Sequence, residues 1–252
     1  MRTFVFTCLL LLGMTTFAQD ANFHIYLCLG QSNMEGNAKV EEQDTVAVDS
    51  RFQVLAAVDC PNLGRTKGNW YKAVPPLARC YTGLTPGDYF GRAMVANLPS
   101  NVRVGIINVA VGGCRIELFD KDNYQFYVET SPDWLKNMVK EYGGNPYARL
   151  VEMAKLAQKD GVIKGILLHQ GESNTNDKDW PLKVKGVYDN LLNDLGLSAA
   201  NVPLLAGEVV HADQNGVCAS MNTIIDSLPQ VIPTAHVISS AGCPAAFDNL
   251  HF

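Results

Sequence analysis

The stretch that decides the fold is FHIYLCLGQSNM, which spans residues 23–34. Its first seven residues are apolar apart from His24, a pattern that predicts a buried strand, and Gly30 marks the turn that ends it. Ser32 lies in this turn. Because ligands of open α/β sheets bind beyond the carboxyl ends of the strands, Ser32 is well placed to act as a nucleophile.

Short apolar runs and segments of helical spacing alternate along the chain. In addition to 23–29, strands are predicted at 102–109, 162–169, 202–207 and 235–239. Helices are predicted at 88–98, 146–159, 179–195 and 221–228. This alternation predicts a three-layer α/β/α fold around a doubly wound, mainly five-stranded parallel sheet.

Two long stretches, 35–87 and 115–145, interrupt this rhythm and are expected to be irregular. Loops of that length in a compact domain are usually functional, so they could form the walls of a substrate cleft. Equally, they could simply cover an edge of the sheet.

Length and composition narrow the class of protein. The chain has 252 residues, of which 47% are hydrophobic and 18% are charged, which suits one globular domain over 19–252. The formal net charge is −5 and the basic residues form no cluster, which excludes a nucleic-acid partner. No apolar stretch after residue 18 has the length of a membrane span, so we expect no membrane insertion.

Residues 1–18 have the pattern of a secretory signal peptide. Arg2 provides a positive start, 4–14 form a short apolar segment, and Thr16, Phe17 and Ala18 resemble a cleavage site. We therefore expect an exported protein, periplasmic or extracellular after cleavage.

Six cysteines lie outside this segment, which permits up to three disulfides in an exported protein. Cys28 lies in a predicted core strand and is expected to be a buried free thiol. Cys60 could pair with Cys80, and Cys218 with Cys243. No cysteine or histidine spacing suggests a metal site.

Chemically useful residues follow four of the predicted strands. They are Ser32, the pair Gly112–Gly113, the run from His169 to Asn174, and the turn from Asp248 to His251. A parallel sheet brings these strand ends to one edge. A serine nucleophile needs a base, a carboxylate that orients the base, and hydrogen-bond donors for the oxyanion, and these segments contain all three.

On these residues the chain resembles the SGNH hydrolase superfamily, which has a flavodoxin-like fold. More narrowly, it is similar to the sialate O-acetylesterase and acetylxylan esterase group, the family-six carbohydrate esterases. The residues that carry the resemblance form four blocks, at 30–34, 111–113, 169–173 and 248–252, with a further similar segment at 85–91.

The resemblance implies a role for each block. Ser32 would be the nucleophile and His251 the base. The backbone N–H groups of Ser32 and Gly113 and the side chain of Gln170 would form the oxyanion hole. The orienting carboxylate would be Asp248, which lies three residues before His251, with Glu172 as the competing or sharing candidate. Esterases of this kind need no cofactor.

The expected substrate is an acetylated oligo- or polysaccharide, of either the acetylxylan or the sialate type. A short-chain lipid esterase and a non-catalytic carbohydrate-binding relative are the alternatives. Weaker candidates for substrate contact are Asn33, Asn174, His211 and Trp70. In the family a helix follows the last block, so the domain at 19–252 is expected to lack its C-terminal helix.

Overall fold

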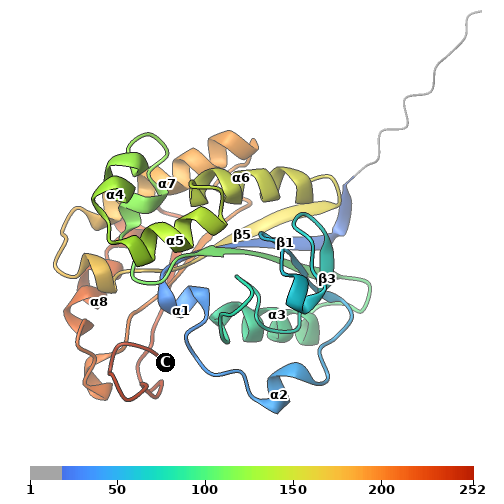
Figure 1. Ribbon diagram of the computed structural model, residues 1–252, viewed down its shortest axis with the longest axis horizontal. Helices are drawn as coiled ribbons and strands as arrows, with labels where there is room; N and C mark the ends of the chain where they lie inside the picture. The colour runs from blue at the N-terminus through green and yellow to red at the C-terminus, as the bar shows by residue number, and fades with distance from the viewer. Residues whose placement is uncertain (1–18) are drawn as a thin grey trace, which may run out of the picture.

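The computed structural model describes residues 19–252, so the predicted signal peptide at 1–18 lies outside the described residues (Figure 1). The centre of the fold is a seven-stranded sheet in the order β3-β2-β4-β1-β5-β6-β7. The strands are β1 (Asp20–Gly30), β2 (Phe52–Leu55), β3 (Trp70–Lys72), β4 (Arg103–Ala110), β5 (Gly161–His169), β6 (Leu204–Gly207) and β7 (Ala235–Ile238). Every neighbouring pair is parallel except β2 and β3. The predicted α/β class is confirmed.

Two strands, β2 and β3, were not predicted and lie inside the stretch at 35–87 that was expected to be irregular. They extend one edge of the sheet beyond β4, and β3 runs antiparallel to β2. The two strands have four and three residues, too few for apolar alternation to distinguish a strand from a loop.

The sheet lies between two helical layers. The helices are α1 (Ser32–Glu35), α2 (Glu42–Thr45), α3 (Pro86–Asn97), α4 (Tyr124–Thr130), α5 (Asp133–Glu141), α6 (Pro146–Ala157), α7 (Trp180–Leu195), α8 (Asn222–Ile225) and α9 (Leu228–Val231). Short 3₁₀ turns are η1 (Pro61–Leu63), η2 (Ile116–Phe119), η3 (Glu172–Asn174), η4 (Ala212–Gln214) and η5 (Ala219–Met221). In Figure 1, α4 to α7 cover one face, while α1 and α3 lie on the other.

Two helical expectations need correction. The stretch at 115–145 contains α4 and α5, and is therefore not an irregular loop. The single helix expected at 221–228 is instead the two short helices α8 and α9, with Pro229 in the first turn of the second. Proline has no N–H to continue a preceding helix but is accepted at a helix start, which accounts for the break.

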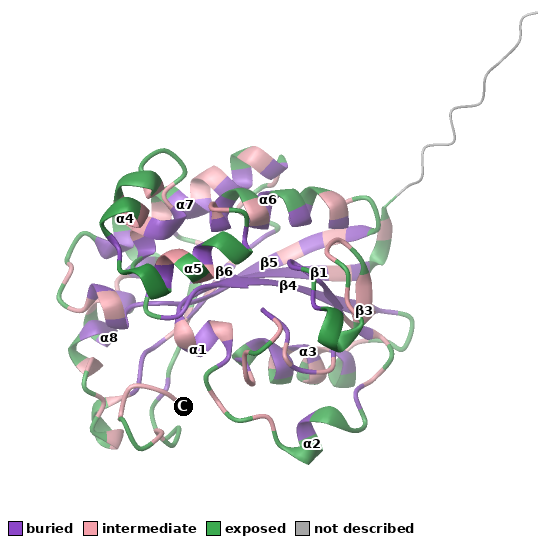
Figure 2. Cartoon of the chain, in the orientation of Figure 1, coloured by how far each residue is buried: buried purple, intermediate pink, exposed green. Residues whose placement is uncertain are grey.

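Each face of the sheet has its own core. The larger cluster includes Leu27, Ile107 and Leu191 under α6 and α7, and the smaller includes Cys28 and Phe52 on the face of α3. Figure 2 shows the central strands buried between these layers. Two cavities of about 430 and 340 Å³ lie on the α3 face, against β6 and β7.

The centre of the sheet positions the site. β1 pairs with β4 on one side and with β5 on the other, so Gly30 lies opposite both Ala110 and His169. The backbone of Gly30 has φ +151°, and a Cβ there would lie 2.0 Å from the His169 carbonyl oxygen. Only glycine allows this approach, which brings the segments after three strands together at one edge.

Of the two disulfides considered, Cys60–Cys80 is formed and Cys218–Cys243 is not. Cys28 is a buried free thiol, as predicted. Within residues 19–252, no helix combines the length and the apolar character of a membrane span.

Candidate active site

Ser32, His251 and Asp248 form a continuous chain of contacts. Ser32 is the first residue of α1, and its Oγ lies 2.8 Å from His251 Nε2. The other ring nitrogen of His251, Nδ1, lies 2.7 Å from Asp248 Oδ2. The histidine can therefore exchange a proton with the serine while the aspartate holds its opposite edge.

A tight turn presents Asp248 to His251. The second carboxylate oxygen of Asp248 accepts hydrogen bonds from the backbone N–H groups of Leu250 and His251, at 3.0 and 3.1 Å. The hydrogen bond with His251, followed by these backbone bonds, lowers the pKa of Asp248 to about 2. The carboxylate is consequently ionised wherever a neutral histidine could act as a base.

Asn33 holds this C-terminal turn against the nucleophile. Its side-chain nitrogen donates to the Leu250 carbonyl at 3.2 Å, and its oxygen accepts from the Phe252 N–H at 3.3 Å. The same nitrogen donates to Glu172 Oε1 at 2.8 Å. Asn33 is buried, and these bonds engage both polar atoms of its amide within the protein.

Glu172 contacts Asn33 and lies near His169, with no hydrogen bond to His251 within residues 19–252. It is 8% exposed, and its Oε2 is buried with no partner in the described part of the chain. Of the two candidate carboxylates, geometry connects Asp248 directly to the histidine and Glu172 only through Asn33. His169 itself is a buried residue whose Nε2 lies 3.0 Å from the Glu208 carbonyl.

The loop after β4 lies close to the nucleophile. A Cβ at Gly112 would be 3.8 Å from Ser32 Cβ, and Gly113 has the left-handed φ of +68°. The Gly112 N–H donates to Glu35 Oε1 at 2.9 Å, and Ser173 Oγ donates to the Gly113 carbonyl at 3.0 Å. The N–H groups of Ser32 and Gly113 find no acceptor within residues 19–252.

Gln170 is not brought to the cleft, contrary to the expectation of a third oxyanion donor. It is 1% exposed, and its amide nitrogen, which has two N–H donors, lies within hydrogen-bond distance of three acceptors: Asn174 Oδ1 at 2.8 Å, Gln31 Oε1 at 3.1 Å and the Cys114 carbonyl at 3.2 Å. Its amide oxygen accepts from the indole N–H of Trp180. Both polar atoms of its amide are hydrogen-bonded within the protein, so this side chain connects the segments that follow β1, β4 and β5.

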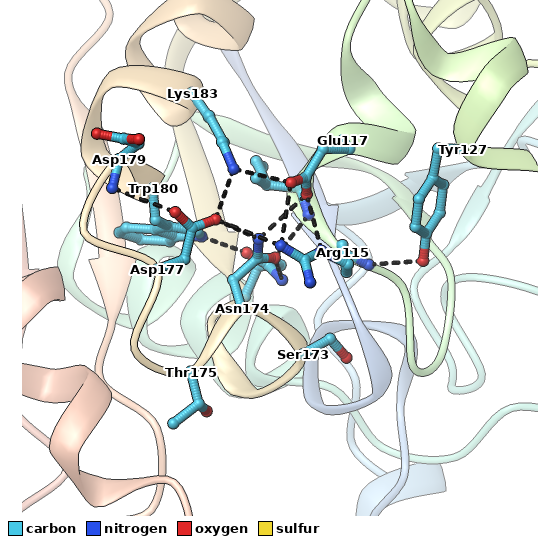
Figure 3. Close-up of polar contacts among 12 residues, drawn as sticks. Arg115, Glu117, Tyr127, Ser173, Asn174, Thr175, Asp177, Asp179, Trp180 and Lys183 are labelled. Atoms are coloured by element: carbon cyan, nitrogen blue, oxygen red, sulfur yellow. Dashed lines mark hydrogen bonds and ion pairs between the residues drawn. The ribbon is translucent and has the colours of Figure 1, made fainter. Parts of the chain in front are cut away.

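Asn174 also lies behind the site, in the polar cluster of Figure 3. It is 1% exposed, and its nitrogen donates to Glu117 at 3.1 Å and to Asp177 at 3.0 Å. Lys183 Nζ lies 2.9 Å from Glu117 and 2.6 Å from Asp177. Burial alone would raise the pKa of Glu117, but hydrogen bonds from Lys183, Asn174 and Arg115 lower it to about 2. Asn174 is thus engaged in this cluster and is not among the residues that line the cleft around Ser32.

His211 and Trp70 lie outside the cleft. His211 is in the loop after β6, with Nδ1 3.2 Å from Asp213. Trp70 is in β3; its ring centroid lies 4.7 Å from that of Phe23 and its N–H donates to Asp160. Phe23 is near the amino end of β1, far along the strand from Ser32. Packing of an edge strand explains this tryptophan, and neither residue is among those that line the cleft around Ser32.

An open cleft of about 400 Å³ surrounds Ser32 and His251. Residues that the sequence analysis did not assign to the site also line it: Glu35, Asn37, Trp134 and Met138. Trp134 and Met138 are four residues apart on α5, a helical spacing that could have indicated a common face. In the described part of the chain, no group of three histidine, cysteine or acidic side chains is arranged to hold a metal ion.

The fold is a mostly parallel seven-stranded sheet between two helical layers, with Ser32, His251 and Asp248 together at one edge. The family model described as "carbohydrate esterase, sialic acid-specific acetylesterase" matches residues 22–252. This chain belongs to that family of carbohydrate esterases.

Solved structures agree on the fold. A protein from Arabidopsis thaliana has a TM-score of 0.68 at 19% identity, covering 92% of this chain and 91% of that one. A carbohydrate acetylesterase from Xanthomonas citri has a TM-score of 0.60 at 17% identity, with 88% and 51% covered. NanS has a TM-score of 0.61 at 15% identity, with 90% and 81% covered.

Proposed function

We propose that this protein is an exported serine esterase that removes O-acetyl groups from carbohydrates through an acetyl-Ser32 intermediate. The observation that carries the proposal is the contact chain from Ser32 Oγ to His251 and from His251 to Asp248, at 2.8 and 2.7 Å. Membership of a carbohydrate esterase family supports the reaction class.

In the proposed reaction, His251 Nε2 takes the hydroxyl proton as Ser32 Oγ bonds to the acetyl carbon. The N–H groups of Ser32 and Gly113 donate to the resulting oxyanion. His251 then protonates the departing sugar oxygen, leaving acetyl-Ser32. Water attacks the acetyl carbon while His251 accepts its proton, and collapse of the second tetrahedral intermediate releases acetate and returns the proton to Ser32. Asp248 orients His251 and stabilises its charged form.

The proposed role of Glu172 is positional. Its carboxylate accepts from Asn33, and Asn33 in turn bonds to the backbone on both sides of His251. A carboxylate at this point would keep the asparagine amide in one orientation and thereby hold the C-terminal turn close to Ser32. Asp248 would remain the only carboxylate that acts on the histidine itself.

Acetylated sugars are the proposed substrates because of the family and the cleft wall. Trp134 is 54% exposed, lines the cleft and lies against Gly113, where a Cβ would be 2.7 Å from its ring. An exposed indole offers an apolar surface with a polar edge, which suits the face of a sugar ring. Both acetylxylan-type and sialate-type substrates fit this description.

Export is proposed on the pattern of residues 1–18 and on the Cys60–Cys80 disulfide, since disulfides persist in oxidising compartments. A secretion assay with the intact chain and with a variant lacking 2–18 tests it. Equal protein in the medium or periplasm from both would contradict export.

Hydrolysis of p-nitrophenyl acetate by wild type, Ser32→Ala and the control Ser198→Ala tests the nucleophile. Ser198 is exposed and lies outside the cleft. We expect the first substitution alone to abolish turnover, and a fluorophosphonate to label Ser32 in the wild type. Full activity in Ser32→Ala would remove the proposed mechanism, and an inert, unlabelled wild type would favour a non-catalytic binding protein. Faster hydrolysis of octanoyl than acetyl esters would favour a lipid esterase.

A further inference from the structure

We propose that Glu35 and Arg79 position the glycine loop that supplies the Gly113 oxyanion donor, an inference that rests on the proposed function. Glu35 Oε1 accepts the Gly112 N–H at 2.9 Å and lies 2.5 Å from Arg79 Nη2. Neither residue belongs to the chain of contacts from Ser32 to Asp248. They are positioning residues, because they would act through the loop.

The loop is held on both sides of the peptide that carries the Gly113 N–H. The peptide that precedes Gly112 is fixed by the bond from its N–H to Glu35. The peptide that follows Gly113 is fixed by the bond from Ser173 Oγ to its carbonyl, at 3.0 Å. Between them lies the peptide with the Gly113 N–H, which has no acceptor within residues 19–252. Two anchored neighbours thus set its orientation in advance of the reaction.

Glu35 is a suitable anchor because it shares an element with the nucleophile. Ser32 and Glu35 are the first and last residues of the four-residue helix α1. A Cβ at Gly112 would lie only 2.8 Å from Glu35 Oε2, so the loop approaches this carboxylate as closely as a glycine allows. A bond from Glu35 to Gly112 therefore ties the position of the oxyanion donor to that of the attacking oxygen.

Arg79 holds Glu35 and offsets its charge. The guanidinium is buried and pairs with both Glu35 and Glu141. Glu141 ends α5, the helix whose Trp134 lines the cleft. An unpaired carboxylate at position 35 would oppose the negative charge that develops on the oxyanion nearby, and a buried partner cation removes most of that penalty.

The test compares Glu35→Ala, Glu35→Gln, Arg79→Met and the double variant Glu35→Gln/Arg79→Met, with Glu152→Ala as the control. Glu152 is a surface glutamate on α6 that pairs with Lys67 and Arg149, away from the cleft. Both kcat and KM for p-nitrophenyl acetate are measured well below each variant's melting temperature. The rate of labelling by a fluorophosphonate, which also needs the oxyanion donors, gives a second readout.

We expect Glu35→Ala to lower kcat about 10- to 100-fold with little change in KM, a loss below that for deleting an oxyanion donor. Glu35→Gln retains an oxygen that can accept from the Gly112 N–H, so its kcat should fall much less. Arg79→Met should lose more than Glu35→Gln, because it leaves the carboxylate unpaired. The double variant, which removes that charge, should recover activity relative to Arg79→Met.

The outcomes distinguish a failure of the proposed function from a failure of the inference about Glu35 and Arg79. A wild type without esterase activity would overturn the proposed function. An active wild type whose Glu35→Ala variant matches Glu152→Ala in kcat and labelling rate would overturn this inference alone, as would a loss confined to melting temperature. A double variant no faster than Arg79→Met would overturn the charge argument. If Glu35→Ala does not fold, Glu35→Asp, which withdraws the carboxylate by one carbon, must still lower kcat.

Discussion

At the scale of single residues, the two carboxylates near His251 have different connections. Asp248 lies 2.7 Å from the ring, whereas Glu172 reaches the histidine turn only through Asn33. We predict that Asp248→Asn lowers kcat by up to about 10⁴-fold, because an amide favours the wrong tautomer of the histidine. Steady-state kinetics with p-nitrophenyl acetate measures this loss.

Glu172→Gln is the matched comparison. The amide oxygen of this variant can still accept from Asn33. We therefore expect kcat to fall by less than about tenfold, well below the fall caused by the loss of an acid–base partner. Equal losses of kcat in the Asp248 and Glu172 variants would mean that both carboxylates act on His251, contrary to the direct contact of Asp248 and the indirect connection of Glu172 through Asn33.

The variant Gln170→Ala distinguishes a structural role of Gln170 from a role as an oxyanion donor. If Gln170 is a structural residue, Gln170→Ala removes its buried hydrogen bonds with Trp180, Asn174 and the Cys114 carbonyl and should destabilise the fold. Each polar group left without a partner costs about 1–3 kcal/mol, so the melting temperature should fall clearly. Thermal unfolding and kcat of the variant are compared; a normal melting temperature with a large fall in kcat would restore the oxyanion role.

The residues that sequence reasoning brought together correctly are those whose side chains must face the edge of the sheet. Ser32 follows directly on β1, and Asp248 and His251 share one turn, so strand-end placement and spacing were sufficient. Gln170 and Asn33 follow strands equally closely, yet their amides point into the protein. An amide at a strand end can hydrogen-bond either to a ligand or to a buried loop, and which of the two it does depends on the acceptors around it.

At the scale of elements, α3 begins with a buried carboxylate. Asp88 Oδ2 accepts the Thr85 N–H at 2.8 Å, while its Oδ1 is buried without a partner within residues 19–252. Burial, opposed by this backbone hydrogen bond, raises the pKa of Asp88 to about 7 from the ordinary 3.8. Between these values the folded protein retains a proton that the unfolded chain releases, so stability falls as pH rises from about 4 to 7.

Asp88→Asn should remove this contribution, because the amide carries no charge at either pH. We predict that the melting temperature of the wild type falls more between pH 5 and pH 8 than that of the variant. Asp189→Asn, a partly exposed position on α7 whose carboxylate pairs with Lys185, is the control and should follow the wild type. Parallel curves for wild type and Asp88→Asn would show that the buried carboxyl does not titrate in this range.

The long helices and the central strands were predictable because each repeats its period over many residues. α6 and α7 place apolar side chains on one face over three or more turns. By contrast, β2 and β3 have four and three residues and depend on pairing with a distant strand. Their formation is decided by the exposed edge of β4 rather than by local sequence, as is common for short strands.

At the scale of the whole molecule, charge distinguishes the possible substrates. The chain has a formal net charge of −5, Glu35 and Glu172 are among the residues that line the cleft, and Asp248 lies beside His251. Arg79 is already paired with Glu35 and Glu141. An acetylated sialoside is an anion and should be repelled on approach, whereas an acetylated xylo-oligosaccharide is neutral.

We therefore predict opposite salt responses for the two substrates. Raising ionic strength from about 0.01 M to 0.15 M shortens the Debye length from about 30 to 8 Å, which screens repulsion between exposed charges. The kcat/KM for acetate release from the sialoside should rise over this range, while that for the xylo-oligosaccharide stays constant. A fall for the sialoside would instead reveal attraction by a cation at the bound carboxylate, and would point to the anionic sugar as the substrate for which the cleft is built.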